Sequence, residues 1–171
     1  MMKMKKVLVF LAVVCVSFLV ACSSQPSKNA DGTPSTLKSR YLGYYSSDTD
    51  NATYFDELTN EFDFDVEKST ISDGTGIDSH IKEYQVLEED ELASHFQGQA
   101  IKNKEQVENS DVVFYIGLMS DDGNGDRDGK ISPDEQRSVY QIVLSNDGTT
   151  IKIISLGDGW DQFVFTGTAK E

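Results

Sequence analysis

The chain has 171 residues, of which 15 are basic and 29 are acidic, and its formal net charge is −14. This balance excludes a nucleic-acid binder, because such a protein needs a basic surface to neutralise phosphates. A strongly acidic chain instead favours cations, or basic patches on a protein partner. The length predicts a single folded domain.

The N-terminus has the order of features of a secretory signal. Three lysines fall within the first six residues, and an apolar run over residues 7–20 follows them. That run is shorter than the about 20 residues that a membrane-spanning helix needs, so we predict a signal segment. The alternatives are an ordinary secretory signal without lipid and an uncleaved anchor helix.

The signal ends in Leu19-Val20-Ala21-Cys22, which resembles the lipobox of bacterial lipoproteins at all four positions. The resemblance implies a signal peptide over residues 1–21, cleavage before Cys22 and a lipid on the Cys22 thiol. Two or three acyl chains are enough for stable membrane attachment. The resemblance therefore implies a location on the outer face of the bacterial cytoplasmic membrane. Cleavage removes three lysines and no acid, so the remaining chain carries a net charge of −17.

The remaining chain has no free thiol, because Cys15 lies in the signal and Cys22 carries the lipid. A disulfide, a zinc–thiolate site and a cysteine nucleophile are thus excluded for the folded domain. Residues 22–39 are rich in Ser, Pro, Thr, Asn and Gly, which predicts a flexible tether. We expect a single folded domain over residues 40–171.

Hydrophobic patterning along this domain predicts mixed strand and helix. Residues 41–45 are typical of a strand. Phe55, Leu58 and Phe62 form a helical stripe, but Phe62 also alternates with Phe64 in the manner of a half-buried strand. Further strands are expected at residues 81–87, 112–119, 139–144 and 151–156 and through 163–165, and a short acidic helix at 88–96. Residues 101–110 are polar and fit neither pattern.

Short turns between the C-terminal strands, such as Asn146-Asp147-Gly148, favour an antiparallel meander over βαβ crossovers. We therefore predict an α+β fold, an antiparallel sheet with one or two short helices. The pattern leaves open whether the sheet curls into a barrel.

Residues 124–135 resemble the EF-hand calcium loop over all twelve positions. Short acidic or amide side chains at positions 1, 3 and 5 reach a central ion, Gly at position 6 permits the sharp turn, and a carboxylate at position 12 closes the site. The implied Ca²⁺ ligands are Asn124, Asp126, Asp128, the carbonyl of Lys130, Ser132 and Glu135.

This loop departs from the EF-hand pattern in two ways. Position 1 carries the neutral Asn124, and the preceding residues 112–119 predict a strand where the family has a helix. We therefore expect a single structural calcium site with a dissociation constant of roughly 10⁻⁴ to 10⁻³ M, and no calmodulin-like opening. The alternative is a solvated acidic hairpin loop without an ion.

His80 and His95 are the candidates for acid–base catalysis, but neither lies in a nucleophile or metal spacing that we recognise. We therefore predict that the protein is not an enzyme; a hydrolase would need one of these histidines beside a carboxylate. Trp160 and the cluster of Tyr41, Tyr44 and Tyr45 either line a ligand cleft or fill the edge of the core.

These features together predict a lipid-anchored bacterial surface protein with a calcium-stabilised acidic domain that acts as a binding module. The expected partner is an envelope protein, a cell-wall polymer or an incoming macromolecule. If the sheet closes, a lipocalin-like carrier of a small apolar ligand is the alternative, and it requires an apolar cavity. An envelope hydrolase that uses His80 or His95 with a carboxylate is the third hypothesis.

Overall fold

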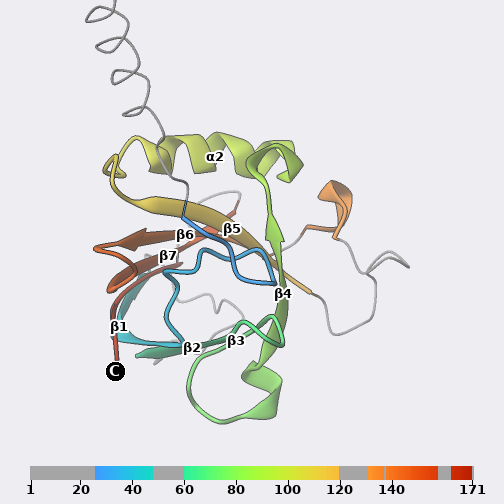
Figure 1. Cartoon of the computed structure of the whole chain (residues 1–171). Coiled ribbons are helices and arrows are strands. Elements are labelled where there is room, and N and C mark those ends of the chain that lie inside the picture. The colour runs from blue at the N-terminus through green and yellow to red at the C-terminus, as the bar shows by residue number, and fades with distance from the viewer. Residues whose placement is uncertain (1–25, 48–59, 120–130, 137, 158–162, 171) are drawn as a thin grey trace, which may run out of the picture.

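The computed structural model describes residues 26–47, 60–119, 131–136, 138–157 and 163–170, which form an antiparallel barrel (Figure 1). Each strand pairs with the next, and the last strand pairs with the first to close the barrel. The strands are β1 (Arg40–Ser47), β2 (Glu61–Asp65), β3 (Thr70–Ser72), β4 (Lys82–Leu87), β5 (Val112–Leu118), β6 (Val139–Ser145), β7 (Thr150–Leu156) and β8 (Phe163–Ala169). The predicted antiparallel meander is confirmed, and the sheet curls fully into a closed barrel.

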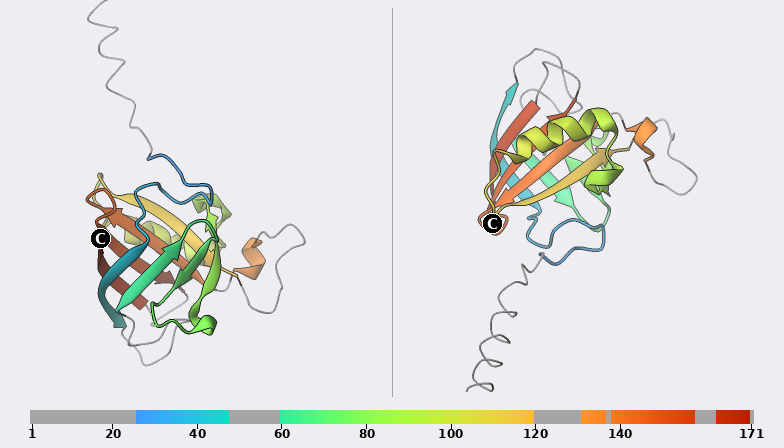
Figure 2. Two further views of the ribbon diagram at one scale, coloured as in Figure 1. Left: turned by 60° about the horizontal axis from the view of Figure 1, so that its bottom comes forward. Right: turned by 90° about the horizontal axis from the view of Figure 1, so that it is seen from above.

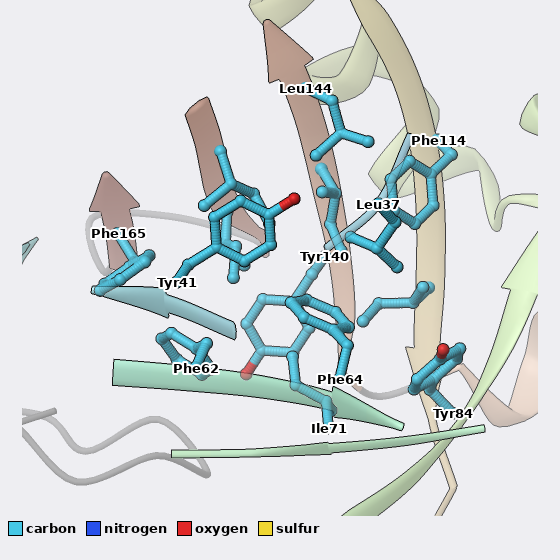
Figure 3. Packing of buried hydrophobic residues seen from close by; sticks show 14 of the residues in the cluster. Leu37, Tyr41, Phe62, Phe64, Ile71, Tyr84, Phe114, Tyr140, Leu144 and Phe165 are labelled. Carbon is cyan, nitrogen blue, oxygen red and sulfur yellow. The ribbon is translucent and has the colours of Figure 1, made fainter. Parts of the chain in front are cut away.

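Alternate side chains of the strands fill the interior of the barrel (Figure 3). Phe62 lies in β2 and is fully buried, so its strand assignment is confirmed. Its ring centroid lies 4.7 Å from that of Phe165 in an edge-to-face arrangement, and Tyr41 meets Phe64 at 6.1 Å in the same way. Such aromatic pairs add about 0.5–1.5 kcal/mol each beyond the burial of their area.

A second apolar cluster lies outside the barrel wall, beneath the helix α2 (Ser94–Lys104) (Figure 1). Phe96 and Ala100 of α2 pack there against Tyr115 of β5, whereas the next residue, Ile116, points into the barrel. Strand β5 is therefore buried on both faces, as its continuous apolar run predicts. None of the helices in the described residues is long and apolar enough to cross a membrane.

The predicted helix over residues 88–96 is wrong in its bounds. Glu89–Glu91 forms only the single 3-10 turn η2, and the α-helix begins at Ser94 and continues through residues that the sequence left unassigned. A capping box between Glu88 and Glu91 starts this turn. The helix does not continue from it because Gln136 binds the Glu91 carbonyl and the Ala93 N–H, two groups that a continuous helix would pair internally. Leu92 is extended after this turn, which separates the two elements.

Residues 26–39 differ from the predicted tether, because they pack across one end of the barrel (Figure 2). Leu37 joins the barrel core, and Thr33 is completely buried. The Asp31 carboxylate accepts hydrogen bonds from the Thr33 N–H and hydroxyl and from the Tyr84 hydroxyl. The folded part therefore begins before Arg40. The helical stripe at Phe55 and Leu58 lies outside the described residues.

The alternation of strand direction assigns every connection to one of two ends. We define the covered end as residues 26–39 with the turns at residues 66–69 and 146–149. The Tyr41 hydroxyl of β1 links the cover to one of these turns, because it accepts from the Lys38 N–H and donates to the Gly148 carbonyl, each at 2.9 Å. We define the loop end as the opposite end, where β1, β3, β5 and β7 finish. The longer chain connections leave and return there, except for the one that contains η2 and α2.

Candidate functional site

Most of the negative charge of the chain belongs to the four connections of the loop end. These connections are residues 48–60, 73–81, 119–138 and 157–162, and they contain 14 acidic and 3 basic residues. Their net charge of −11 is about two thirds of the −17 that remains after the predicted cleavage. Ten of these acidic residues lie outside the part of the chain that the structure describes, so the charge is assigned to the connections by sequence. Where charge of one sign is concentrated on one part of a surface, it attracts ligands of the opposite sign and speeds their association.

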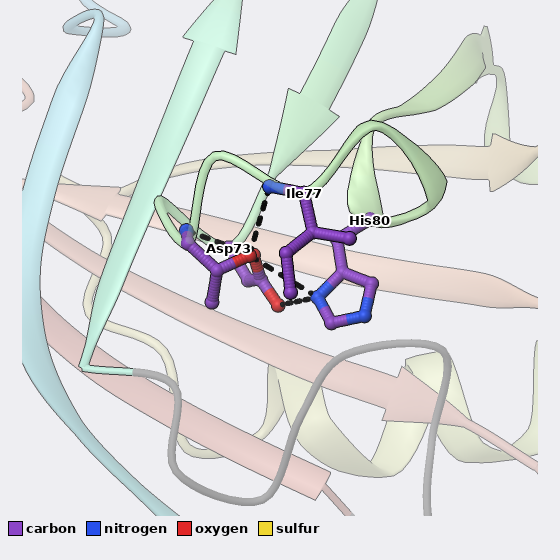
Figure 4. Close-up of polar contacts among 4 residues, drawn as sticks. Asp73, Ile77 and His80 are labelled. Carbon is purple, nitrogen blue, oxygen red and sulfur yellow. Dashed lines mark hydrogen bonds and ion pairs between the residues drawn. The ribbon is translucent and has the colours of Figure 1, made fainter.

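The connection between β3 and β4 is described completely, and it is folded around the buried carboxylate of Asp73 (Figure 4). The Thr75 N–H and hydroxyl both donate to Asp73 Oδ1, at 3.1 and 2.6 Å. Gly74 and Gly76 have φ values of +70° and +73°, a backbone conformation that glycine adopts without strain. The loop is thus closed by its own polar side chain.

His80 completes this arrangement from the 3-10 turn η1 (Asp78–His80). Its Nδ1 lies 2.6 Å from Asp73 Oδ2, and a quarter of its side chain is exposed (Figure 4). Burial acts to raise the pKa of Asp73, but hydrogen bonds from Thr75 and His80 outweigh it and hold that pKa below its ordinary value. An ionised carboxylate only accepts hydrogen bonds, so Nδ1 carries a proton and Nε2 is left as the acceptor of the neutral ring.

An Asp–His pair of this kind can orient a histidine as a general base or as a metal ligand. In the described part of the chain, however, no group of three or more His, Cys, Asp or Glu residues is placed to hold a metal. The Thr75 hydroxyl, whose oxygen lies 3.2 Å from His80 Nδ1, already donates its proton to Asp73. The geometry therefore supports a structural role for the Asp73–His80 pair, which holds this loop closed. The exposed apolar side chains of Ile77 and Ile81 flank the turn η1.

The predicted calcium loop lies largely outside the described residues. This is true of Asn124, Asp126, Asp128 and Lys130 and of the Glu135 side chain. Ser132 is described and directly precedes the 3-10 turn η3 (Pro133–Glu135).

Both ends of this exit segment are fixed, one to strand β4 and the other to the chain between η2 and α2. The Ile131 N–H donates to Gln85 Oε1 at 2.7 Å. Gln136 is buried; its Oε1 accepts from the Ala93 N–H at 2.9 Å and its Nε2 donates to the Glu91 carbonyl at 2.7 Å. A change in the loop is thus connected directly to β4 and to the start of α2.

The other predicted candidates are not brought together. Cys22 and Trp160 lie outside the described residues, and His95 is exposed in the first turn of α2, where its ring contacts Phe96. The three tyrosines of β1 do not share one face, because Tyr41 and Tyr45 pack with the interior, whereas Tyr44 is 69% exposed. They therefore line no common cleft.

The sequence pointed to His80 but not to its partner Asp73. The sequence signal at Asp73 is the triplet Asp-Gly-Thr, which marks a turn and does not name the partner of the carboxylate. It occurs three times, at residues 147–149 and, with a shared geometry, at 31–33 and 73–75. In the latter two places the carboxylate accepts from the Thr N–H and hydroxyl two residues later. This is the hydrogen-bonding habit that makes Asp frequent in turns.

A scan against protein-family models, a search of curated proteins and a search of solved structures each find no match for this chain. The fold and the described residues are therefore what a functional proposal can be built on.

Proposed function

We propose that the protein is a lipid-anchored bacterial surface protein that binds a positively charged partner at the loop end of its barrel. The lipobox at Cys22 and the absence of any other thiol after it support the anchor. The observation that carries the binding proposal is the net charge of −11 in the loop-end connections. A suitable partner is an envelope protein or a cell-wall polymer that exposes cationic groups.

Calcium has a defined place in this proposal, at residues 124–135. Without an ion, the carboxylates of Asp126, Asp128 and Glu135 would converge and repel one another. The fixed exit segment supports a structural role, because Ile131 is hydrogen-bonded to strand β4 and Gln136 to the chain directly before α2.

Thermal or urea unfolding with and without Ca²⁺ tests the calcium site. For a dissociation constant of 10⁻⁴ to 10⁻³ M, 10 mM Ca²⁺ should raise the free energy of unfolding by about 1.4–2.7 kcal/mol. Asp128→Asn should remove most of this increase, whereas the control Asp134→Asn makes the same charge change at a non-ligand position and should retain it. An equal response of both variants, or none in the wild type, would refute the site.

Site-specific photo-crosslinking on intact cells tests the binding surface. A photoreactive residue in place of the exposed Ser79 at the loop end should capture a partner, and one in place of the exposed Glu67 at the covered end should not. The captured species should decrease as salt is raised, because electrostatic attraction between exposed charges is screened. Capture from Glu67 alone would contradict the proposal.

A carrier of a small apolar ligand is the second candidate, and the closed eight-stranded barrel supports it. The described interior side chains pack directly on one another, so a ligand would have to occupy space beyond them. Native mass spectrometry of the protein purified from its bacterial host separates the two proposals. A carrier should show an adduct that organic extraction removes, whereas a binding module should show only the protein and its metal.

A further inference from the structure

The covered end of the barrel is a fixed surface. Residues 26–39 are attached by the Asp31–Tyr84 hydrogen bond, by burial of Leu37 and by the hydrogen bond from the Lys38 N–H to the Tyr41 hydroxyl. Pro26, where the described chain begins, lines a small cleft of about 180 Å³ between this cover and strands β4 and β5. The chain therefore enters the folded part at the end opposite to the loops (Figure 2).

The covalent distance from this entry to the predicted lipid is short. Cys22 precedes Pro26 by four positions, and four residues span at most about 14 Å when fully extended. A strand of seven residues measures about 24 Å, or roughly 18 Å along the axis of a barrel whose strands tilt by about 40°. The anchor can thus lie against the covered end but cannot reach the loop end on the far side.

The difference in net charge between the two ends favours the same orientation, with the covered end toward the membrane. Residues 26–39, 66–69, 146–149 and 170–171 contain four lysines and four acidic residues, so their net charge is zero. The connection over residues 88–111, which contains η2 and α2, also starts and ends at this end. It adds seven acidic and two basic residues, so all connections of the covered end together carry −5. Within it, Glu88 and Glu89 are paired with Lys28 and Lys104. Anionic lipid headgroups would therefore repel the loop end, with its net charge of −11, more strongly than the covered end.

The distance between the loop end and the lipid headgroups weakens this repulsion only when the covered end faces the membrane. Charges are screened over about 8 Å at physiological ionic strength. With the covered end on the lipid, the loop end lies beyond that range. We propose that the covered end is a membrane-facing surface that rests on anionic lipid headgroups and holds the loop end outward; this inference depends on the proposed lipid at Cys22.

Fluorescence quenching in a membrane tests this orientation. In the lipidated protein the Cys22 thiol is consumed, so an introduced cysteine is the only free thiol. Three exposed positions provide matched single labels: Glu67→Cys at the covered end, Lys102→Cys on α2 and Ser79→Cys at the loop end. The lipidated variants are reconstituted in phosphatidylethanolamine–phosphatidylglycerol vesicles with a headgroup-attached nitroxide quencher.

The label at position 67 should be quenched severalfold more than that at position 79, with position 102 between them. Insertion of ten Gly/Ser residues directly before Pro26 should reduce quenching at position 67, because the short covalent distance is then lost. Equal quenching at positions 67 and 79, or stronger quenching at 79, would overturn the orientation while leaving the anchor intact. A wild-type chain that does not associate with vesicles and carries no lipid would instead refute the anchor, and the orientation with it.

Discussion

The Asp-Gly-Thr turns at residues 31–33 and 73–75 share one local geometry and serve opposite ends of the barrel. In both, the carboxylate accepts from the Thr N–H and hydroxyl, the glycine has a positive φ, and the second carboxylate oxygen accepts from a ring group 2.6 Å away. At the covered end that group is the Tyr84 hydroxyl, and at the loop end it is His80 Nδ1.

The surroundings of the two turns differ more than their geometry. Thr33 and Tyr84 are almost completely buried, so their donors have no access to water if the carboxylate is lost. Thr75 is exposed and His80 is partly exposed, so water can replace Asp73 for the three donors of these two residues. The same triplet thus fixes a structural cover in one place and a solvent-accessible loop in the other.

Asp31→Ala should produce the largest effect, a loss of about 3 kcal/mol or more in the free energy of unfolding, because three donors lose their acceptor. The variant leaves the donors of Thr33 and Tyr84 unpaired in the barrel, and each such buried group costs about 1–3 kcal/mol. Urea unfolding at pH 7 measures the loss. Glu67→Ala removes one exposed negative charge from the same end and should change stability by less than about 0.5 kcal/mol. Similar losses in the two variants would contradict the structural role of Asp31.

The turns also show how far the sequence predicts the fold. The strands are readable because their apolar alternation is local, and the turn at Asn146-Asp147-Gly148 is confirmed. Its triplet at residues 147–149 is again Asp-Gly-Thr, yet there Asp147 itself has a φ of +56° and is exposed. Three letters therefore predict a turn but not the partner of its carboxylate.

Closure of the barrel and the cover depend on contacts between residues far apart in the chain. Strand β8 pairs with β1 across more than 110 residues, and no local pattern specifies this pairing. Residues 26–39 contain only one large apolar side chain, Leu37, and that single side chain enters the core. Their composition is that of a linker, so the sequence predicted a tether. The Asp73–His80 pair was missed for the same reason, since its members are seven residues apart across a loop.

Tyr84→Phe should have the next largest effect, a loss of about 1–2 kcal/mol at pH 7, because it removes only the hydroxyl that donates to Asp31. It should also change the alkaline limit of stability. Burial, and secondarily the nearby Asp31 carboxylate, raises the pKa of Tyr84 above its ordinary value near 10. A raised pKa in the folded state gives stability that is complete below pH 10 and is lost as the pH rises above it.

Urea unfolding between pH 7 and pH 11 measures this alkaline loss. The wild type should lose stability above pH 10 more steeply than Tyr84→Phe, which cannot ionise at this position. Tyr44→Phe is the matched control, because Tyr44 is 69% exposed and should behave as the wild type does. Parallel pH profiles for the wild type and Tyr84→Phe would show that the buried hydroxyl does not control the alkaline limit.

Asp73→Asn should have the smallest effect on global stability, below about 1 kcal/mol, and a clear local one. The pKa of Asp73 is lowered in the folded state, so its contribution is present above the unfolded value near 3.9 and is lost as the pH falls below it. At neutral pH the ionised carboxylate closes the loop; Asn carries no charge and accepts through one oxygen only. Amide hydrogen exchange at Thr75 and Ile77 should therefore become at least tenfold faster at pH 7.

Asp78→Asn makes the same charge change in the same loop and should leave these rates unchanged. If both variants accelerate exchange equally, the loss of one negative charge explains the effect; if neither does, the loop is held by its backbone and the two Asp-Gly-Thr turns are not equivalent.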